Sequence, residues 1–296
     1  MKVVVTGASG LIGSALVPHL RARGHQVVRL VRRAPGAADE VQWQPGAPLD
    51  PGSLTGIQAA VHLAGAGVGD HRWTPEYKRT ILASRVDGTR TLVDALTALD
   101  PLPQVLVSGS AIGVYADRAD EPMAETASPG TGFLAEVVLA WEAEAQRAAG
   151  PGIRVAMART GLVMAPHGGA FGRLLTLARF GLAGPMGSGR QWWSWITLDD
   201  EIAALTFLLE SDTIEGPVNL TAPDPRRQAD LTRVLAGRLH RPSLLPAPAF
   251  ALRLVLGEFS QELTASQRVV PQRLLDAGFT FGHPDLDSAA DWLTGR

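Results

Sequence analysis

The sequence predicts an α/β fold: a doubly wound parallel sheet followed by a small, mainly helical C-terminal domain. Three observations lead to this fold class. The first half alternates short apolar runs with amphipathic helical patterns, as parallel sheets with crossover helices do. A glycine-rich turn at 7–13 joins the first apolar run to the first helical pattern. Beyond residue 224, helical patterns separated by proline and glycine continue to the end of the sequence.

The first half supplies the sheet and its crossover helices. Short apolar runs predict buried strands, and a 3.6-residue period predicts helices. The predicted strands cover residues 3–6, 26–31, 59–63, 104–107 and 153–158. The predicted helices cover residues 11–23, 74–99 and 133–149.

After residue 165 the sequence becomes rich in glycine, proline and tryptophan. Thr197 is a suitable N-cap for a helix through Leu209, and 217–220 predicts a short strand. Further helices are predicted at 228–239, 249–257, 262–276 and 285–294. We therefore expect a dinucleotide-binding domain over 1–165, rejoined by about 196–222. The segments 166–195 and 223–296 then form a substrate and C-terminal domain.

Composition limits the classes of function. The 27 basic and 29 acidic residues give a net charge of −2, which argues against a nucleic-acid partner. The chain has no cysteine, so disulfides, iron–sulfur clusters and a thiol nucleophile are excluded. No stretch offers about 18 uninterrupted apolar residues, and the start does not read as a signal segment. We expect a cytoplasmic protein without a membrane partner, acting on a small molecule, with a homodimer as one option.

The strongest motif is the TGASGLIG run at 6–13, which lies between a predicted strand and a helix. Its glycines permit a tight turn, close approach of a pyrophosphate and close packing of the helix on the strand. The helix N-terminus adds free N–H groups and a positive dipole end. An ordinary strand-to-helix turn is the alternative. The predicted cofactor contacts here are Thr6, Gly7, Ser9, Gly10, Leu11, Ile12 and Gly13.

The end of the second predicted strand indicates which dinucleotide fits. NAD sites of the Rossmann type place an acidic residue about 20 positions beyond the glycines, whereas arginine there suits a 2′-phosphate. Residues 14–38 contain no acidic side chain, and Arg32 and Arg33 directly follow the strand. Bidentate guanidinium contacts to phosphate are strong. We expect NADP(H); two solvated loop arginines are the alternative.

Further motifs carry a family resemblance. HLAG at 62–65 and SGSAIGVY at 108–115 follow predicted strands. With TGASGLIG, they resemble an extended short-chain dehydrogenase/reductase of the nucleotide-sugar epimerase-like branch. RWTPEYKRTILASRVDGTRTLVDAL, FLAEVVLAWE and GPMGSGRQWWSWITLDD are similar to an "epimerase family" subgroup whose members carry a C-terminal domain of unknown function. The resemblance spans the chain. We add as cofactor contacts Leu63, Ala64, Gly65, Arg85, Ser108 and Arg159.

The resemblance implies a catalytic pair that this sequence lacks. Short-chain dehydrogenases use tyrosine and lysine four residues apart on one helix, with the phenol as acid and base. The only tyrosines are Tyr77 and Tyr115, and neither has a lysine four positions later. In the helix where the pair belongs the sequence has Phe133 and Val137, which cannot move a proton.

Replacement groups are therefore sought elsewhere. Ser110 and Tyr115 follow a strand at the expected site, and Glu136 shares a helix face with Phe133. These three are the catalytic candidates, with turn chemistry and a solvated glutamate as the alternatives. Substrate contacts are assigned to Lys78, Arg190, Trp193 and Trp195, with a solvent-facing lysine and tryptophan packing as the alternatives. His62 reads as a core residue, and no histidine spacing predicts a metal.

Three functions remain open at this stage. The leading hypothesis is an NADP(H)-dependent oxidoreductase acting on a small organic substrate. A nucleotide-sugar epimerase-type isomerase is the second, although epimerisation by transient oxidation needs a base at the hydroxyl. A non-catalytic NADP(H)-binding sensor or scaffold is the third, and the loss of the dyad favours it.

Overall fold

The computed structural model describes residues 1–295, apart from the side chain of Ala170, and leaves Arg296, the last residue of the expected C-terminal domain, outside. Its centre is a seven-stranded sheet in the order β11-β7-β5-β4-β1-β2-β3, in which all neighbours are parallel. The strands are β1 (Lys2–Thr6), β2 (Gln26–Val31), β3 (Glu40–Gln42), β4 (Ala59–His62), β5 (Val105–Ala111), β7 (Arg154–Thr160) and β11 (Gly216–Leu220). The predicted fold class is confirmed.

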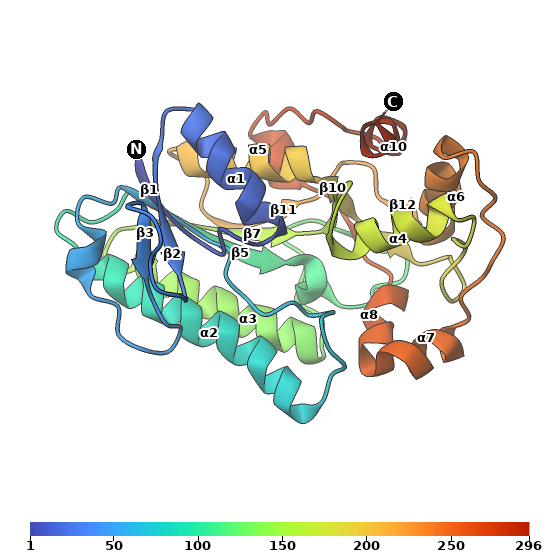
Figure 1. Ribbon diagram of the computed structural model, residues 1–296, viewed down its shortest axis with the longest axis horizontal. Helices are drawn as coiled ribbons and strands as arrows, with labels where there is room; N and C mark the ends of the chain where they lie inside the picture. Colours follow the sequence, from blue (N-terminus) through green and yellow to red (C-terminus); the bar gives the residue numbers. More distant parts are fainter. Residues whose placement is uncertain (296) are drawn as a thin grey trace.

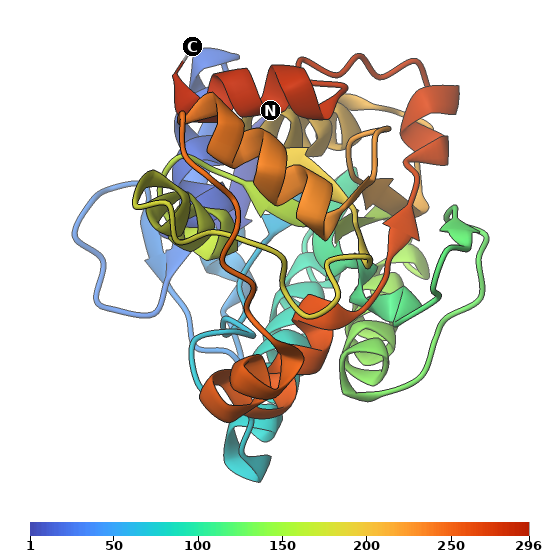
Figure 2. The ribbon, with the colours of Figure 1, turned by 90° about the vertical axis from the view of Figure 1, so that its right-hand side faces the viewer.

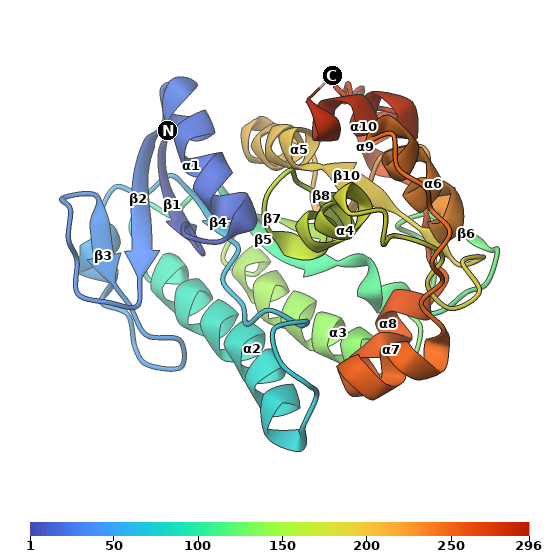
Figure 3. The same ribbon diagram turned by 45° about the vertical axis from the view of Figure 1, so that its right-hand side comes forward.

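Helices cover both faces of the sheet (Figures 1 and 3). They are α1 (Leu11–Ala22), α2 (Pro75–Thr97), α3 (Phe133–Gln146) and α5 (Leu198–Glu210). Val3 and Val5 pack in one core with α1 and α5, whereas Val4 packs in another with α2 and α3. Successive side chains of a strand point to opposite faces, so an unbroken apolar run is what a doubly covered strand requires.

Capping residues begin two of these helices where the sequence predicts. The hydroxyl of Thr74 accepts a hydrogen bond from the Tyr77 amide, and Pro75 occupies the first turn of α2. The hydroxyl of Thr197 accepts from the Asp200 amide and caps α5. Both caps satisfy amides that lack a partner within the helix.

Most of the remaining helices lie beyond the carboxyl ends of the central strands, on the right in Figure 1 and in front in Figure 2. The helices are α4 (Gly169–Arg179), α6 (Gln228–Arg238), α7 (Ala249–Leu256), α8 (Ser260–Thr264), α9 (Gln272–Asp276) and α10 (Leu286–Thr294). Short strands pair two by two: β8 (Leu162–Met164) with β10 (Trp195–Thr197), β9 (Trp192–Trp193) with β12 (Arg226–Arg227), and β6 (Pro122–Met123) with β13 (Arg268–Val269). One-turn 3-10 helices are η1 (Pro51–Leu54), η2 (Ile112–Tyr115), η3 (Arg147–Ala149) and η4 (Gly257–Phe259).

The predicted helix over 262–276 is wrong. The chain leaves α8 after Thr264, forms the two-residue strand β13 and resumes a helix only at Gln272. Ser194 explains the interruption, because its hydroxyl donates to the carbonyl of Gln267 and accepts from the amide of Val269. A contact 75 residues away in sequence therefore overrides the local helical pattern.

Within the described residues, no helix is long and apolar enough to span a membrane.

Candidate functional site

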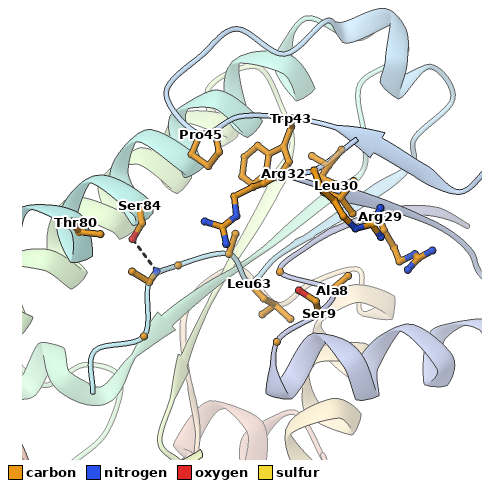
Figure 4. A pocket seen from close by; sticks show the side chains of 18 of the residues that line it. Ala8, Ser9, Arg29, Leu30, Arg32, Trp43, Pro45, Leu63, Thr80 and Ser84 are labelled. Atoms are coloured by element: carbon orange, nitrogen blue, oxygen red, sulfur yellow. Dashed lines mark hydrogen bonds between the residues drawn. The ribbon is translucent and has the colours of Figure 1, made fainter. Parts of the chain in front are cut away.

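A pocket of about 760 Å³ opens at the carboxyl ends of β1, β2 and β4 (Figure 4). This edge of a doubly wound sheet is where ligands bind. Eight of the predicted cofactor residues line it: Gly7, Ser9, Gly10, Arg32, Arg33, Leu63, Ala64 and Gly65. Thr6, Leu11, Ile12, Gly13, Arg85, Ser108 and Arg159 are not among its lining residues.

The glycine-rich turn depends on its missing side chains. Gly7 has φ +68°, and a Cβ there would lie 2.7 Å from the carbonyl carbon of Leu63. A Cβ on Gly13 would lie 2.2 Å from the carbonyl oxygen of Gly7. Gly10, the residue before α1, makes no side-chain cap. The first amides of α1 are thus available to an anion at the positive end of the helix dipole.

Thr6 holds the facing wall of the pocket. Its hydroxyl accepts hydrogen bonds from the amides of Leu63 (3.0 Å) and Ala64 (3.1 Å), and lies 2.7 Å from Nδ1 of His62. Burial, followed by the nearby charge of Arg85, lowers the pKa of His62 to about 4, so this histidine is neutral at pH 7. Thr6 therefore positions the loop after β4 rather than lining the pocket. His62 is fully buried, as expected for a histidine of the core.

The two arginines after β2 differ in what they contact. Arg33 donates two hydrogen bonds to the carboxylate of Glu40, at 2.7 and 2.8 Å. Arg29 similarly holds Asp39, so both acidic residues that follow β2 already have guanidinium partners. Among the described residues Arg32 has no ion pair, and Figure 4 shows its guanidinium pointing into the pocket while Arg29 points away.

The far wall of the pocket comes from α2 and the loop before it. Ser84 accepts a hydrogen bond from the Ala66 amide at 3.0 Å, and the Tyr77 hydroxyl donates to the carbonyl of Gly67. These contacts fix the loop against the helix. Sequence reasoning missed the lining residues Glu40, Trp43, Pro45, Asp70, His71, Thr80 and Ser84. No motif marks them, because the lining combines three separate stretches of chain.

Two catalytic candidates belong to one buried network. The carboxylate of Glu142 accepts hydrogen bonds from Ser110 (2.6 Å) and, at 2.8 Å on each oxygen, from Arg159. Arg159 also donates to the Tyr115 hydroxyl (3.0 Å), which itself donates to Asn219 (2.8 Å). Tyr115 is fully buried, and burial raises its pKa. The network occupies the polar groups of these side chains with one another.

Two other predicted residues lie apart from this network. Ser108 is fully buried, and its hydroxyl donates to the neighbouring carbonyl of Gly109. Glu136 is exposed on α3. The structure thus does not bring Glu136 together with Ser110 and Tyr115.

An aromatic cluster surrounds the position where the family dyad would lie. The ring of Phe133 makes an edge contact with Trp73 at 5.1 Å between centroids. The ammonium of Lys78 lies 5.0 Å from the Phe133 centroid and forms an ion pair with Glu258. Val137 is buried. Lys78 therefore links α2 to the C-terminal region, and an apolar ring replaces the phenol.

The tryptophans assigned to substrate pack inside the protein. Trp195 is fully buried, and Trp193 contacts Phe171 while donating its indole N–H to the carbonyl of Leu263. Arg190 is exposed, and among the described residues it makes hydrogen bonds only through its backbone amide and carbonyl. In this structure, Trp193 and Trp195 therefore pack in the interior, which is the alternative that the sequence left open.

One buried acid was missed altogether. Glu201, in the first turn of α5, is 0% exposed and accepts one hydrogen bond from Thr160, at 2.8 Å. Its other carboxyl oxygen has no partner within residues 1–295. Burial raises its pKa to about 8, against the lowering effect of the Thr160 hydrogen bond. Acidic residues are favourable in the first turn of a helix, so the position of Glu201 in the sequence gives no sign of its burial.

No group of three or more histidine or carboxylate side chains is arranged to hold a metal ion in the described part of the chain.

Known proteins match the whole chain. The epimerase family protein Mb2239 of Mycobacterium bovis is 40% identical over 296 residues, covering 99% of this chain and 98% of its own. The chloroplastic SDR39U1 homolog of Arabidopsis thaliana is 36% identical, covering 98% and 85%. The crystal structure of human epimerase family protein SDR39U1 (isoform 2), determined with NADPH, superposes with a TM-score of 0.91 at 31% identity, covering both chains fully.

Two family models divide the chain between them. A domain of unknown function, DUF1731, matches residues 247–293, in agreement with the C-terminal resemblance. The model of the NAD dependent epimerase/dehydratase family matches residues 3–220, which include the pocket and all of the seven-stranded sheet except Lys2. With this match and full-length relatives at 40% identity, the chain belongs to the NAD dependent epimerase/dehydratase family.

Proposed function

We propose that this protein binds NADP(H) in the pocket at the carboxyl ends of β1, β2 and β4 and is an oxidoreductase acting on a small organic substrate. The observation that carries the proposal is the contrast at the end of β2. Arg32 points into the pocket without an ion pair among the described residues, while Arg33 and Arg29 hold the nearby acidic groups. Human SDR39U1, crystallised with NADPH, supports the same cofactor.

The residues present fit a dinucleotide with a 2′-phosphate. The amides at the start of α1 would hold the pyrophosphate, because Gly10 leaves its surface open and the helix dipole is positive there. Arg32 would hold the 2′-phosphate by charge-assisted hydrogen bonds. The cofactor supplies the hydride chemistry, and the protein supplies binding and orientation.

Proton transfer sets this chain apart from dehydrogenases with the tyrosine–lysine dyad. Phe133 and Val137 carry no exchangeable proton, and the Tyr115 hydroxyl is bonded to Asn219 and Arg159. The Ser110 hydroxyl likewise donates its proton to Glu142, so it can polarise a substrate carbonyl only by exchanging that partner for the substrate. Without a positioned general acid, a reaction typically loses about 10²–10⁴-fold in rate. We therefore propose slow turnover on generic carbonyl compounds.

A sensor that binds NADP(H) without turnover is the second candidate, and the occupied Tyr115 hydroxyl favours it. An epimerase-type isomerase is less supported, because it needs a base at the substrate hydroxyl. Incubation with NADPH and a panel of carbonyl compounds separates the first two. Oxidised cofactor released with any compound supports the oxidoreductase, whereas tight cofactor retention with no turnover on the whole panel supports the sensor.

Arg32 and Arg33 provide a matched test of the cofactor assignment. Charge-assisted contacts of about 1.5–3 kcal/mol imply that Arg32→Ala weakens NADPH binding at least about tenfold. NADH binding should change little. Arg33→Ala should cost less, because the Arg33 guanidinium is engaged by Glu40. Calorimetric titration of both cofactors against both variants measures this. Unchanged NADPH affinity in Arg32→Ala would sink the assignment.

A further inference from the structure

The most exposed apolar side chains of the molecule gather in its C-terminal region. Five large ones each expose between 68% and 79% of their surface: Phe180, Leu244, Phe250, Leu254 and Val255. No other large apolar side chain among residues 1–295 exceeds 52%, and the two at that value, Leu182 and Leu245, lie within two positions of this set in the sequence. These seven residues are called the apolar strip below. They present on the order of 700 Å² of apolar surface, whereas the largest patch on a typical monomer covers about 300–600 Å².

The strip is one continuous surface, because the segment between α4 and β9 runs beside the segment between α6 and α7. The carbonyl of Pro185 accepts a hydrogen bond from the amide of Ala247 (2.8 Å), and the carbonyl of Ala247 accepts one from the amide of Gly187 (2.9 Å). Nearer α4, a Cβ on Gly181 would lie 3.6 Å from Cδ of Pro242. Both segments lie on the side that faces the viewer in Figure 2 and lead to α7 at its lower edge.

The backbone and the flanking residues of α7 hold it in place, while its side chains face outward. Arg72 donates hydrogen bonds to two carbonyls at the end of the helix. Just beyond the helix, Glu258 forms an ion pair with Lys78, and the ring of Phe259 packs on Trp73 at 5.7 Å between centroids. None of the residues of α7 is buried. The exposed apolar face therefore belongs to a helix that is fixed on the rest of the protein.

The charges beside the strip are all positive. Residues 167–198 and 231–257, which contain the whole strip, include no acidic side chain. Arg179, Arg241 and Arg253 are exposed in these stretches, and none has a carboxylate partner within residues 1–295. The chain as a whole has a net charge of −2, so this surface differs in sign from the molecule that carries it. A partner for this surface has to offer both an apolar phase and negative charge.

The shape of the strip favours a lipid surface over a second copy or a protein groove. Side chains that expose more than two thirds of their area protrude from the fold, and protruding side chains suit insertion into a soft apolar phase. A symmetric contact between two copies would bring the same three arginines against one another. Helices that lie in a membrane surface combine phenylalanine and leucine on one side with arginine or lysine beside them, as α7 and its neighbours do.

We propose that the apolar strip docks this protein on the surface of a membrane that contains anionic phospholipids. The apolar side chains enter the boundary between headgroups and acyl chains, and Arg179, Arg241 and Arg253 bind lipid phosphates. The expectation of a protein without a membrane partner rests on the lack of a spanning stretch, and docking on a surface needs no such stretch. This inference is independent of the proposed NADP(H) function.

Vesicle binding of the full-length protein tests the inference. Sedimentation with vesicles of phosphatidylcholine alone, or with phosphatidylglycerol added in a two-to-one ratio, measures the partition coefficient. We expect binding at least about tenfold stronger with phosphatidylglycerol at low salt, and weaker binding at high salt. Phe250→Ser combined with Leu254→Ser should weaken binding at least about tenfold. Arg253→Glu should reduce the preference for phosphatidylglycerol.

Matched surface positions away from the strip provide the controls. Leu139→Ser changes an exposed leucine of α3, and Arg79→Glu changes an exposed arginine of α2. Both variants should bind vesicles as the wild type does. Circular dichroism checks that every variant is folded.

The absence of cysteine from the chain allows insertion to be measured directly. Leu244→Cys and Leu139→Cys are each labelled with a fluorophore whose emission shifts to the blue in an apolar environment. Vesicles containing phosphatidylglycerol should shift the emission of the label at 244 and leave that of the label at 139 unchanged.

Three results would overturn the inference. The first is that the wild type binds neither kind of vesicle. The second is that binding persists unchanged in the Phe250→Ser and Leu254→Ser double variant, which would place the lipid contact on another face. The third is a dimer in sedimentation velocity without vesicles that the same double variant abolishes, because the strip would then be the contact with a second copy.

Discussion

Replacing Glu201 with glutamine should stabilise the protein at neutral pH and leave its stability unchanged in acid. Glu201 is completely buried, and its single hydrogen bond comes from Thr160. Burial raises its pKa from 4.5 to about 8. Between these values the native state holds the proton that the unfolded state has released. The free energy of unfolding therefore falls as pH rises from 4.5 to 8.

The size of the effect follows from that shift. At pH 7 the unfolded carboxyl is 7 − 4.5 = 2.5 units above its pKa, while the native carboxyl is still mainly protonated. At about 1.4 kcal/mol per unit, Glu201 costs about 3 kcal/mol at pH 7. Glutamine has the same shape and no charge to bury, so Glu201→Gln should recover an amount of this order.

Urea unfolding of the wild type and of Glu201→Gln at pH 4.5, 6, 7 and 8 measures the difference. The stability gap should open steadily from pH 4.5 and reach about 3 kcal/mol at pH 7. Glu136→Gln, at an exposed position of α3, is the control and should show no such opening. A gap that is constant with pH, or a variant less stable than the wild type at pH 7, would refute the assignment of a neutral buried Glu201.

Three further predictions concern the pocket and the missing dyad. Gly10→Val should abolish NADPH binding and leave the circular dichroism spectrum unchanged. The φ of −76° at Gly10 suits valine, but the valine side chain would occupy the space of the pyrophosphate. A folded variant with normal NADPH affinity would show that the motif is an ordinary strand-to-helix turn. Phe133→Tyr with Val137→Lys should raise NADPH oxidation on carbonyl compounds, by up to about 10²–10⁴-fold. Any turnover that the wild type shows should fall when Ser110 is replaced by alanine. If the wild type turns over at ordinary reductase rates, and substitutions of Ser110, Tyr115 and Glu136 leave those rates unchanged, the active site lies elsewhere.

The sequence predicts best the features that depend on neighbours along the chain. Six of the seven strands of the sheet were predicted from short apolar runs, and the glycine-rich turn is contiguous, so these features could be recognised directly. Arg33 shows the limit. Its partner Glu40 stands only seven residues away, but it comes back to Arg33 through β3, a three-residue strand too short to carry a pattern.

Side-chain environments were harder to predict than elements. Tyr115 follows a strand at the expected place, yet its hydroxyl meets Asn219, 104 residues later. Glu142 ends the FLAEVVLAWE segment, but that segment does not reveal its partners; only the packing of α3 against β5 and β7 brings Glu142 to Ser110 and Arg159. A tryptophan ring suits both core packing and contact with a flat substrate, so the sequence could not decide between these roles for Trp193 and Trp195. Their burial in the structure decides for packing.

The central claim is that this pocket holds a dinucleotide through its 2′-phosphate. The most direct test is the ratio of the dissociation constants for NADH and NADPH with the wild-type protein, measured by calorimetry in one buffer. The account predicts that NADPH binds at least about ten times more tightly, since charge-assisted contacts from Arg32 to that phosphate contribute about 1.5–3 kcal/mol. Equal dissociation constants for the two cofactors would contradict it.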